Sequence, residues 1–264
     1  MEKWIDEAFA RACEKMERGA KRAAEQGIIP YMGQKDGYSP APYDGNSWWT
    51  GGFWPGIMWQ LYAATGRDVY KDEALRVEAL LTAELRSFML LNHDVGFMYL
   101  LSTGAHDRLI GDAQAWALYG FMLSGINTGD WKYIDVARKC AKYFIANIRE
   151  DGLTDCDFRQ PKDEERIDNI AGACAACGLL ELANVVGGEE AETYRAAAMK
   201  LLTALNALCA DWTDGNMGIL QKCTASYHND GAGRHVNILY GDYFFIEALC
   251  KLRGTDARLW MAGK

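Results

Sequence analysis

The sequence predicts an all-α protein built from helical hairpins that follow one another in a solenoid or a closed ring. Apolar residues recur at helical spacing through most of the chain, and strand signals are few and short. A pattern of two helices joined by a glycine turn repeats, and a period of about sixty residues with paired helices is typical of solenoids and rings. A simple bundle explains the periodicity equally well, but not the aromatic residues that gather near the loops.

The first expected helix covers residues 3–26, where Ile5, Phe9 and Met16 share an apolar face and Gly27 follows as a stop signal. Residues 31–51 are rich in Gly, Pro and Tyr, which predicts a long aromatic loop. Periodicity predicts nine helices, over residues 3–26, 52–65, 69–91, 96–109, 112–127, 131–149, 168–185, 189–210 and 241–253.

The repeat is clearest around two Thr-Gly pairs. A Trp-x-x-Tyr pattern precedes Thr65-Gly66, and the same pattern precedes Thr128-Gly129, which lies 63 residues later. A weaker third copy has Gly187-Gly188 at its turn. Loops such as Asp151-Gly152 and Asp214-Gly215 connect the hairpins, and we expect their glycines to supply the positive φ that tight turns need.

The chain has 264 residues, of which half are apolar and 24% are charged, a balance typical of a folded globular protein. We expect one domain over residues 1–264. A net charge of −8 disfavours nucleic acid and anionic lipid as partners. No apolar run approaches the ~20 residues that a membrane helix needs, and the first residues lack the profile of a signal peptide. We therefore expect a cytoplasmic protein with no membrane or nucleic-acid partner.

The eight cysteines lie mostly in Ala- and Leu-rich segments, which suits reduced, buried thiols better than a disulfide framework. Cys174 and Cys177 form a Cys-x-x-Cys pair, but no second such pair and no His pair accompanies it. Tight helix packing explains the small residues around this pair better than zinc does. We expect neither a metal nor a cofactor.

The densest aromatic cluster covers residues 48–56, a loop that enters a helix with Pro55 near its first turn. Aromatic rings exposed beside a cleft suit the apolar C–H faces of sugars, whereas rings of the same kind also fill protein cores. Both interpretations stay open for Trp49. Trp54 and Trp59 fall on the apolar helical face and are expected in the core.

Two further segments are candidates for chemistry. Asp94, at a helix boundary, is either the N-cap of the following helix, the commonest role of such a residue, or an acid–base group. The adjacent His93 places an imidazole beside the carboxylate, as acid–base chemistry requires. Residues 222–235 are polar, rich in Gly and cationic against an acidic background, which is typical of a site rim or of a solvated connection.

Five motifs stand in order at residues 49–56 (WTGGFWPG), 93–97 (HDVGF), 114–120 (QAWALYG), 176–182 (ACGLLEL) and 241–249 (GDYFFIEAL). Together they resemble the unsaturated glucuronyl hydrolases of glycoside hydrolase family 88 and, less closely, the unsaturated rhamnogalacturonyl hydrolases of family 105. The resemblance covers almost the whole chain. It implies an (α/α)6 toroid that removes the 4,5-unsaturated uronic acid from the non-reducing end of lyase-generated oligosaccharides, typically glycosaminoglycan fragments.

In that family an Asp protonates C4 of the enol ether, water adds at C5, and the resulting hemiketal opens and releases the sugar. The carboxyl group must be protonated when substrate binds, so its pKa must be raised by burial or by a neighbouring carboxylate. The resemblance implies that Asp94 is catalytic. It implies substrate contacts for Trp49, His93 and Trp116, and contacts to a uronate carboxylate or a sulfate for Tyr227, His228 and Arg234.

The chain departs from the family pattern between residues 111 and 114. Residues 102–112 run almost directly into Gln114, so the helices that carry the family's second Asp, its principal general acid and base, are absent. Asp112 stands where a basic residue is usual. Six hairpins of about sixty residues would need roughly 360 residues, whereas this chain has 264. We therefore expect an incomplete (α/α)6-toroid type fold, with about nine of twelve helices.

The loss of the second Asp leaves two alternatives to a hydrolase. One is a non-catalytic carbohydrate-binding remnant, and the other is a toroid completed by a second copy, since an opened ring exposes apolar helix faces. Asp112 would replace the lost group only if closure of the gap brings it close to Asp94. Asp168 precedes a helix and is expected to cap it.

Overall fold

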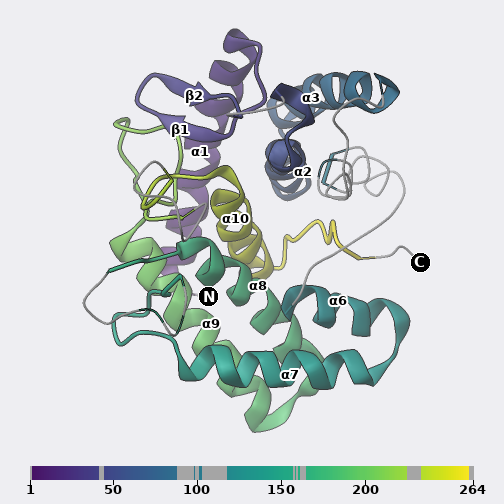
Figure 1. Cartoon of the computed structure of the whole chain (residues 1–264), viewed down its shortest axis with the longest axis vertical. Helices are drawn as coiled ribbons and strands as arrows, with labels where there is room; N and C mark the ends of the chain where they lie inside the picture. Colours follow the sequence, from purple (N-terminus) through teal and green to yellow (C-terminus); the bar gives the residue numbers. More distant parts are fainter. Residues whose placement is uncertain are drawn as a thin grey trace. The chain divides into compact units, whose positions relative to one another are not determined.

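The computed structural model describes residues 2–41, 45–87, 98, 101–102, 118–156, 158, 160, 165–224 and 233–261. Its secondary structure is mostly helical, which confirms the predicted all-α class (Figure 1). The chain divides into two compact units. Unit 1 consists of Met1–Gln114, Asp211–Ile219 and Leu249–Lys264, and unit 2 of Ala115–Ala210 and Leu220–Ala248. Each unit thus combines segments far apart in sequence, and the single domain expected over residues 1–264 stays a prediction.

Eight α-helices lie within these described ranges and correspond to eight of the nine expected ones. Unit 1 contains α1 (Lys3–Gln26), α2 (Phe53–Thr65) and α3 (Asp68–Ser87). Unit 2 contains α6 (Leu118–Thr128), α7 (Trp131–Ala146), α8 (Asn169–Val186) and α9 (Gly188–Leu208), and α10 (Leu239–Arg253) begins in unit 2 and ends in unit 1. The helix expected over residues 96–109 lies outside the described residues apart from positions 98, 101 and 102.

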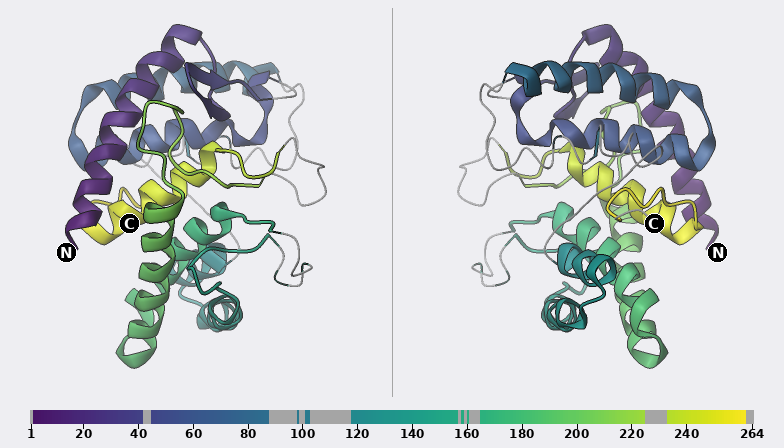
Figure 2. Two further views of the ribbon diagram at one scale, coloured as in Figure 1. Left: turned by 90° about the vertical axis from the view of Figure 1, so that its left-hand side faces the viewer. Right: turned by 90° about the vertical axis from the view of Figure 1, so that its right-hand side faces the viewer.

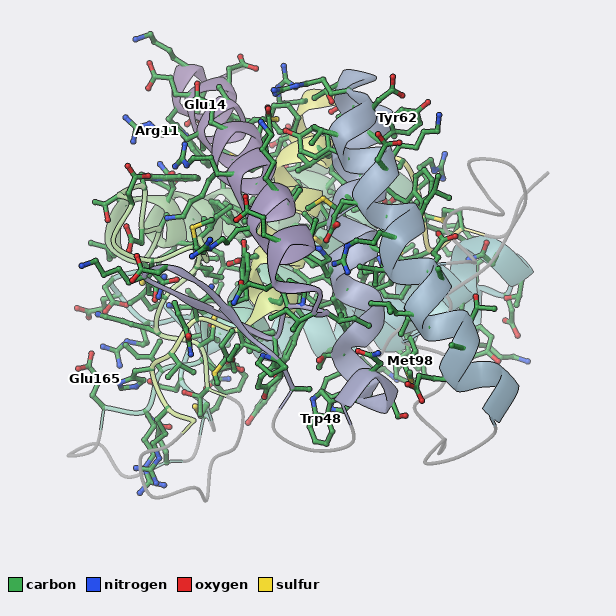
Figure 3. All side chains as sticks on the ribbon, turned by 90° about the horizontal axis from the view of Figure 1, so that it is seen from above. Arg11, Glu14, Trp48, Tyr62, Met98 and Glu165 are labelled. Atoms are coloured by element: carbon green, nitrogen blue, oxygen red, sulfur yellow. The ribbon has the colours of Figure 1, made fainter. Side chains whose placement is uncertain are left out.

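α1 begins and ends where the sequence predicts. Gly27 has a left-handed φ of 68°, and its N–H donates to Ala24 O at 3.1 Å, which closes the last turn. Phe9 lies on the buried face of the helix. Arg11 and Glu14 lie on the exposed face and point outward in Figure 3.

The Thr-Gly repeat is confirmed as a repeated hairpin turn. Gly66 ends α2 with φ 68°, and Gly129 follows α6 with φ 71°. In both turns the Thr hydroxyl before the glycine donates to the carbonyl four residues earlier at 2.6 Å. The two turns join α2 to α3 and α6 to α7, and the helices of each pair pack on each other. Gly187 and Gly188, with φ 72° and 60°, make the third turn between α8 and α9.

The expectation for the two Asp-Gly loops is half right. Gly152 has a φ of 84°, as expected, but Gly215 is not among the residues with positive φ. Side chains shape that second turn instead. The Thr213 backbone N–H donates to Asp211 Oδ1 at 2.7 Å, and the Gly215 N–H donates to Thr213 Oγ1 at 3.0 Å. The buried Lys15 ammonium binds the backbone oxygens of Asp211 and Thr213 at 2.6 and 2.9 Å, so the loop needs no left-handed glycine.

Residues 31–51 are not the single long loop that their composition predicts. Two short strands pair antiparallel, β1 (Met32–Gln34) with β2 (Gly37–Ser39), and two 3-10 helices follow, η1 (Gly45–Ser47) and η2 (Trp49–Gly52). Strands of three residues are too short for the alternation of apolar and polar residues to reveal them.

Two indole–carboxylate hydrogen bonds hold α2 against α3 in unit 1. Trp54 Nε1 donates to Glu73 Oε1 at 2.7 Å, and Trp59 Nε1 donates to Glu78 Oε1 at 2.8 Å. Both indoles are core groups, 0% and 2% exposed, which confirms the sequence prediction. Arg76 forms a two-pronged pair with Glu73, with N–O distances of 2.6 and 2.8 Å, so this buried carboxylate is fully partnered.

α8 is the core helix of unit 2. By length and composition alone it could cross a membrane, since it has 18 residues and a mean hydropathy of 1.5. An apolar run of this length was not predicted. However, 72% of this stretch is buried inside the structure, as expected of a core helix. Cys177 on α8 donates its S–H to Phe244 O of α10 at 3.3 Å. All eight cysteines are free thiols.

The hairpin glycines generate a stability prediction. Nothing lies within 4 Å of a Cβ placed on Gly66 or Gly129, so an alanine at either site meets only backbone strain. We expect Gly66→Ala and Gly129→Ala each to lower the free energy of unfolding by about 1 kcal/mol. Asn tolerates the left-handed region better, so Gly66→Asn should cost less. Urea unfolding followed by circular dichroism measures the effect, and alanine variants as stable as the wild type would contradict it.

Candidate functional site

Trp49 opens the aromatic segment of unit 1 and remains half-buried, unlike the fully packed Trp54. It is the first residue of η2, which leads directly into α2. Its ring packs edge-on against Phe53, with ring centroids 6.1 Å apart and an interplanar angle of 85°. Trp48, labelled in Figure 3, packs in the same way against Tyr31 at 6.4 Å. The structure thus places Trp49 half-buried and packed edge-on against Phe53, which satisfies parts of both interpretations.

Arg234 lies half-buried in unit 2, near the end of the polar segment 222–235. An isolated antiparallel bridge between Cys223 and Val236 closes this segment at its base. Cys223 N–H donates to Val236 O at 2.8 Å, and Val236 N–H donates to Cys223 O at 2.9 Å. The backbone on both sides of the segment is therefore fixed, and Arg234 stands two residues from the bridge.

The segment is also tied to the start of α8. Thr224 N–H donates to Asp168 Oδ1 at 3.2 Å, and Thr224 Oγ1 donates to Ile167 O at 2.7 Å. Ile167 N–H in turn donates to His235 Nε2 at 3.1 Å. Ile167 and Asp168 thus hold both ends of the segment that contains Arg234.

Asp168 caps α8, as the sequence analysis predicts. Its Oδ1 accepts the Ile170 N–H at 3.1 Å in addition to the Thr224 N–H. Burial raises the pKa of Asp168 to about 6, although the backbone N–H groups partly offset this effect. Burial also raises the pKa values of the Cys156 and Cys223 thiols, and the nearby Asp168 carboxylate adds to the increase. These thiols are therefore protonated and unreactive near neutral pH.

The motif at residues 241–249 builds the core of unit 2. Asp242, fully buried, accepts the Leu220 N–H at 2.6 Å and an Asn237 amide N–H at 3.0 Å, both at Oδ1. Tyr119 OH donates to the fully buried Glu247 Oε1 at 2.5 Å. Two of the motifs that carry the family resemblance, around Tyr119 and around Glu247, are thus joined by one buried hydrogen bond. This contact gives them a structural role.

Of the predicted site residues, only Trp49 and Arg234 fall within the described part of the chain, one in each unit. Asp94, His93, Trp116, Tyr227 and His228 lie outside the described residues, as does Asp112. The roles assigned to them stay predictions. Thr224 and His235 were not among the predicted site residues, and the only signal for them was their position at the two ends of the Gly-rich segment.

Within the described ranges, no three His, Cys, Asp or Glu side chains gather closely enough to hold a metal ion. Cys177 is buried in helix packing, and Cys174 on the same helix is half-buried, with its pKa raised by burial. A buried, protonated thiol is a poor metal ligand, because zinc binds the thiolate.

Comparison with solved structures defines the fold class. One similar structure is the crystal structure of an unsaturated glucuronyl hydrolase from Bacillus sp. GL1, described as responsible for the degradation of glycosaminoglycan. Its sequence is 22% identical to this chain, and the two structures superpose with a TM-score of 0.86 over 98% of this chain and 100% of that chain. A Streptococcus agalactiae variant complexed with dGlcA-GalNAc6S is 19% identical, with a TM-score of 0.79 and coverage of 94% and 91%. The protein therefore has the α/α-toroid fold, as predicted.

Sequence comparison leads from this class to particular relatives. No family model matches the chain. The unsaturated glucuronyl hydrolase of Bacillus sp. (strain GL1) is 24% identical over 85% of this chain and 91% of that protein. The enzyme of the same name from Formosa agariphila is 33% identical over 144 residues, which is 52% of this chain and 34% of that protein. The resemblance to the unsaturated glucuronyl hydrolases is confirmed, and the chain is a relative of these enzymes.

The same alignment supports the internal deletion. It extends over 346 residues, whereas 85% of the 264 residues of this chain is about 224. About 120 aligned positions of the Bacillus protein therefore have no counterpart here. The motifs place the break from the family pattern between residues 111 and 114, before α6 in the sequence.

The raised pKa of Asp168 generates a pH prediction. Because the ordinary pKa of 3.8 rises to about 6 in the folded protein, the native state holds this proton at a pH where the unfolded chain has lost it. The Asp168 contribution to the free energy of unfolding therefore falls as pH rises from about 4 to about 6, by at most about 3 kcal/mol, and is constant above that range.

Asp168→Asn keeps an acceptor for both N–H groups but cannot titrate. The difference in the free energy of unfolding between wild type and variant therefore changes with pH only through the Asp168 carboxyl group. Urea unfolding at several pH values measures it, with Asp214→Asn, a highly exposed carboxylate, as the control. Parallel pH profiles for the wild type and Asp168→Asn would contradict the assignment.

Proposed function

We propose that this chain is a glycoside hydrolase that releases 4,5-unsaturated uronic acid from the non-reducing end of lyase-generated oligosaccharides. The observation that carries the proposal is the relationship to an unsaturated glucuronyl hydrolase over 85% of this chain and 91% of that protein, together with the shared fold. A match of this extent cannot come from one common helix.

The proposed reaction is hydration of the enol ether. Asp94 donates its proton to C4, positive charge develops at C5 and the ring oxygen, and water adds at C5 while its proton passes to the Asp94 carboxylate. The hemiketal then opens at the ring oxygen, and the remaining sugar leaves from C1. One water molecule is consumed and Asp94 returns to its protonated form, so no cofactor is needed. A single carboxyl group acts first as acid and then as base.

The remaining predicted residues would bind the substrate. The half-exposed Trp49 supplies an aromatic surface for a sugar face, and Trp116 is proposed as a second one. The Arg234 guanidinium suits the uronate carboxylate or a sulfate, because its planar N–H groups bind such anions in pairs. A complex of the Streptococcus agalactiae relative with dGlcA-GalNAc6S supports glycosaminoglycan disaccharides as the substrate class. His93, Tyr227 and His228 complete the proposed contacts.

We also propose a cytoplasmic location and no nucleic-acid partner. The eight free thiols support a reducing compartment, and the net charge of −8 disfavours phosphate backbones. Cell fractionation with an antibody to the chain tests the location.

Turnover tests the proposed reaction. The wild type should abolish the ultraviolet absorbance of the unsaturated uronyl group in a glycosaminoglycan disaccharide, and Asp94→Asn should slow this loss by about 10²- to 10⁴-fold, as expected for one proton-transfer group. Asp214→Asn is the matched control, because it removes an exposed carboxylate whose ion pair is with the exposed Arg18 side chain. If the wild type leaves the absorbance unchanged while calorimetry detects disaccharide binding, the chain is a carbohydrate-binding protein and not a hydrolase.

Arg234 is tested by separating binding from catalysis. We expect Arg234→Ala to raise KM at least tenfold with little change in kcat, because the guanidinium binds an anion that is present in both ground state and transition state. Arg195→Ala removes an exposed Arg whose side chain binds Asn184 and serves as the control. A fall in kcat at unchanged KM would show that Arg234 does not act as an anion anchor.

A further inference from the structure

The α6–α7 hairpin displays an unusual concentration of exposed aromatic residues. Among the described residues, five large hydrophobic side chains are exposed, and four of them lie on this hairpin: Phe121 at 36%, Trp131 at 55%, Tyr133 at 38% and Tyr143 at 56%. Scattered single hydrophobic residues on a surface are ordinary, but a group on one hairpin is typical of an interaction surface.

Four residues form a continuous apolar stripe along α7. Tyr133, Val136, Cys140 and Tyr143 are spaced by three, four and three residues, which places them on one side of an α-helix over about 15 Å. Val136 and Cys140 are half-buried, and the two tyrosines at the ends are exposed. The stripe lies beside the fully packed face of α7, not on its charged outer face.

An aromatic pair marks each end of the stripe. Phe121 of α6 stacks on Tyr133, with ring centroids 6.3 Å apart and an interplanar angle of 19°. Tyr143 packs edge-on against Phe158, with centroids 5.7 Å apart. We call this surface the α7 flank; it consists of Tyr133, Val136, Cys140 and Tyr143 together with Phe121 and Phe158.

The α7 flank faces away from α9. Arg138 Nη2 binds Glu190 Oε2 of α9 at 3.0 Å, which fixes the side of α7 on which α9 lies. Figure 2 shows α7 nearly end-on with α9 beside it. Val136 and Cys140 are each two residues from Arg138, so they point to the opposite side of the helix.

The position of the flank matches the position of the deletion. In a succession of hairpins, each one packs on the next and on the previous one. The next hairpin, α8–α9, already contacts α6 and α7. The previous one would be encoded just before α6, where the sequence motifs place the break from the family pattern. The side of α7 away from α9 is the side that a preceding hairpin would cover.

We propose that the α7 flank binds the same flank of a second copy of this chain, with the two α7 helices antiparallel about a two-fold axis near residue 138. The four residues of the stripe are spaced by three, four and three positions whether α7 is followed from its N-terminus or from its C-terminus. An antiparallel pairing of two identical surfaces requires this symmetry. Tyr133 then lies opposite Tyr143 of the partner subunit, and Val136 lies opposite Cys140 of the partner subunit. The Phe121–Tyr133 pair meets the Tyr143–Phe158 pair at both ends.

The charges of α7 favour this direction. Asp130 and Asp135 lie in the first half, where Lys132 is within 4.0 Å of Asp130, and Lys139 and Lys142 lie in the second half. The first half is not net acidic, because Lys132 and Arg138 balance the two aspartates. An antiparallel pair still places Lys139 and Lys142 beside the half that contains both aspartates, whereas a parallel pair would place them beside the same two lysines of the partner subunit. A pair of single helices buries less than the ~800 Å² per partner of a standard interface, so we expect dissociation in the micromolar range.

Sedimentation velocity from about 1 μM to about 100 μM tests the proposal. The wild type should shift from a 29.4 kDa monomer to a dimer. Tyr133→Glu alone and Tyr143→Lys alone should each raise the dissociation constant at least tenfold. The combination of both changes should restore the dimer, because the new carboxylate and ammonium face each other only in the antiparallel arrangement.

Trp131→Ala is the matched control, because this exposed aromatic residue lies on the Arg138 side of α7, where Arg138 lies 6.0 Å from its ring. It should leave the dimer unchanged. Circular dichroism verifies that each variant is folded. A wild type that stays monomeric at every concentration overturns the proposal, as does a dimer that resists both single changes. A double variant weaker than either single one overturns the antiparallel arrangement.

Crosslinking gives an independent measurement. Val136→Cys places a thiol opposite the half-buried Cys140 of the partner subunit, so mild oxidation should yield a covalent dimer on a non-reducing gel. Trp131→Cys, on the other side of the helix, should yield no such product. Equal crosslinking by the two variants contradicts the proposed interface.

Discussion

The buried carboxylate of Asp168 is the interaction on which the described part of unit 2 most depends. It caps α8, the core helix, and it also holds the Thr224 backbone at the base of the segment that contains Arg234. The raised pKa shows that removing this carboxylate from water is costly, but in a low-dielectric interior its hydrogen bonds are correspondingly strong. One side chain therefore couples the start of the α8–α9 hairpin to a predicted part of the substrate site.

Local signals predicted much of this fold. The ends of α1 and α2 follow from Gly27 and Gly66, whose left-handed conformation stops a helix, and the Thr-Gly repeat predicted two structurally matching turns. The prediction for Gly215 was wrong because Lys15, nearly 200 residues away in sequence, fixes that loop through Asp211. A turn that depends on a distant ammonium group leaves no local signature. The short β1–β2 hairpin was missed for lack of length.

The candidate site was less predictable for the same physical reason. Asp168 was recognisable as a cap from its place before a helix, a local relationship. His235 was missed because its acceptor role depends on Ile167, 68 residues earlier, and no pattern around His235 indicates that contact. Composition could not decide whether Trp49 is core or surface, and the structure shows a half-buried ring that packs edge-on against Phe53. Motifs at residues 114–120 and 241–249 predicted the family, although the buried Tyr119–Glu247 bond shows that some of their residues serve packing.

The missing segment before α6 connects the fold to the chemistry. It removes the family's second Asp from the sequence, which assigns both proton transfers to Asp94 in the proposed reaction. The proposed α7 interface depends on the same break, because a preceding hairpin would cover this flank. The two consequences are physically separate, because an enzyme can lose a helix neighbour and keep its reaction, or lose its reaction and keep its assembly.

Proton NMR of an unsaturated glucuronyl disaccharide incubated with the protein in D₂O is the most direct test of the central claim, which is that cleavage proceeds by hydration of the C4=C5 bond. The account predicts that the vinyl proton signal at C4 disappears as sugar is released, and that C4 gains one deuterium on a single face. Release of sugar while the vinyl signal persists, or no change in the disaccharide at all, would contradict it.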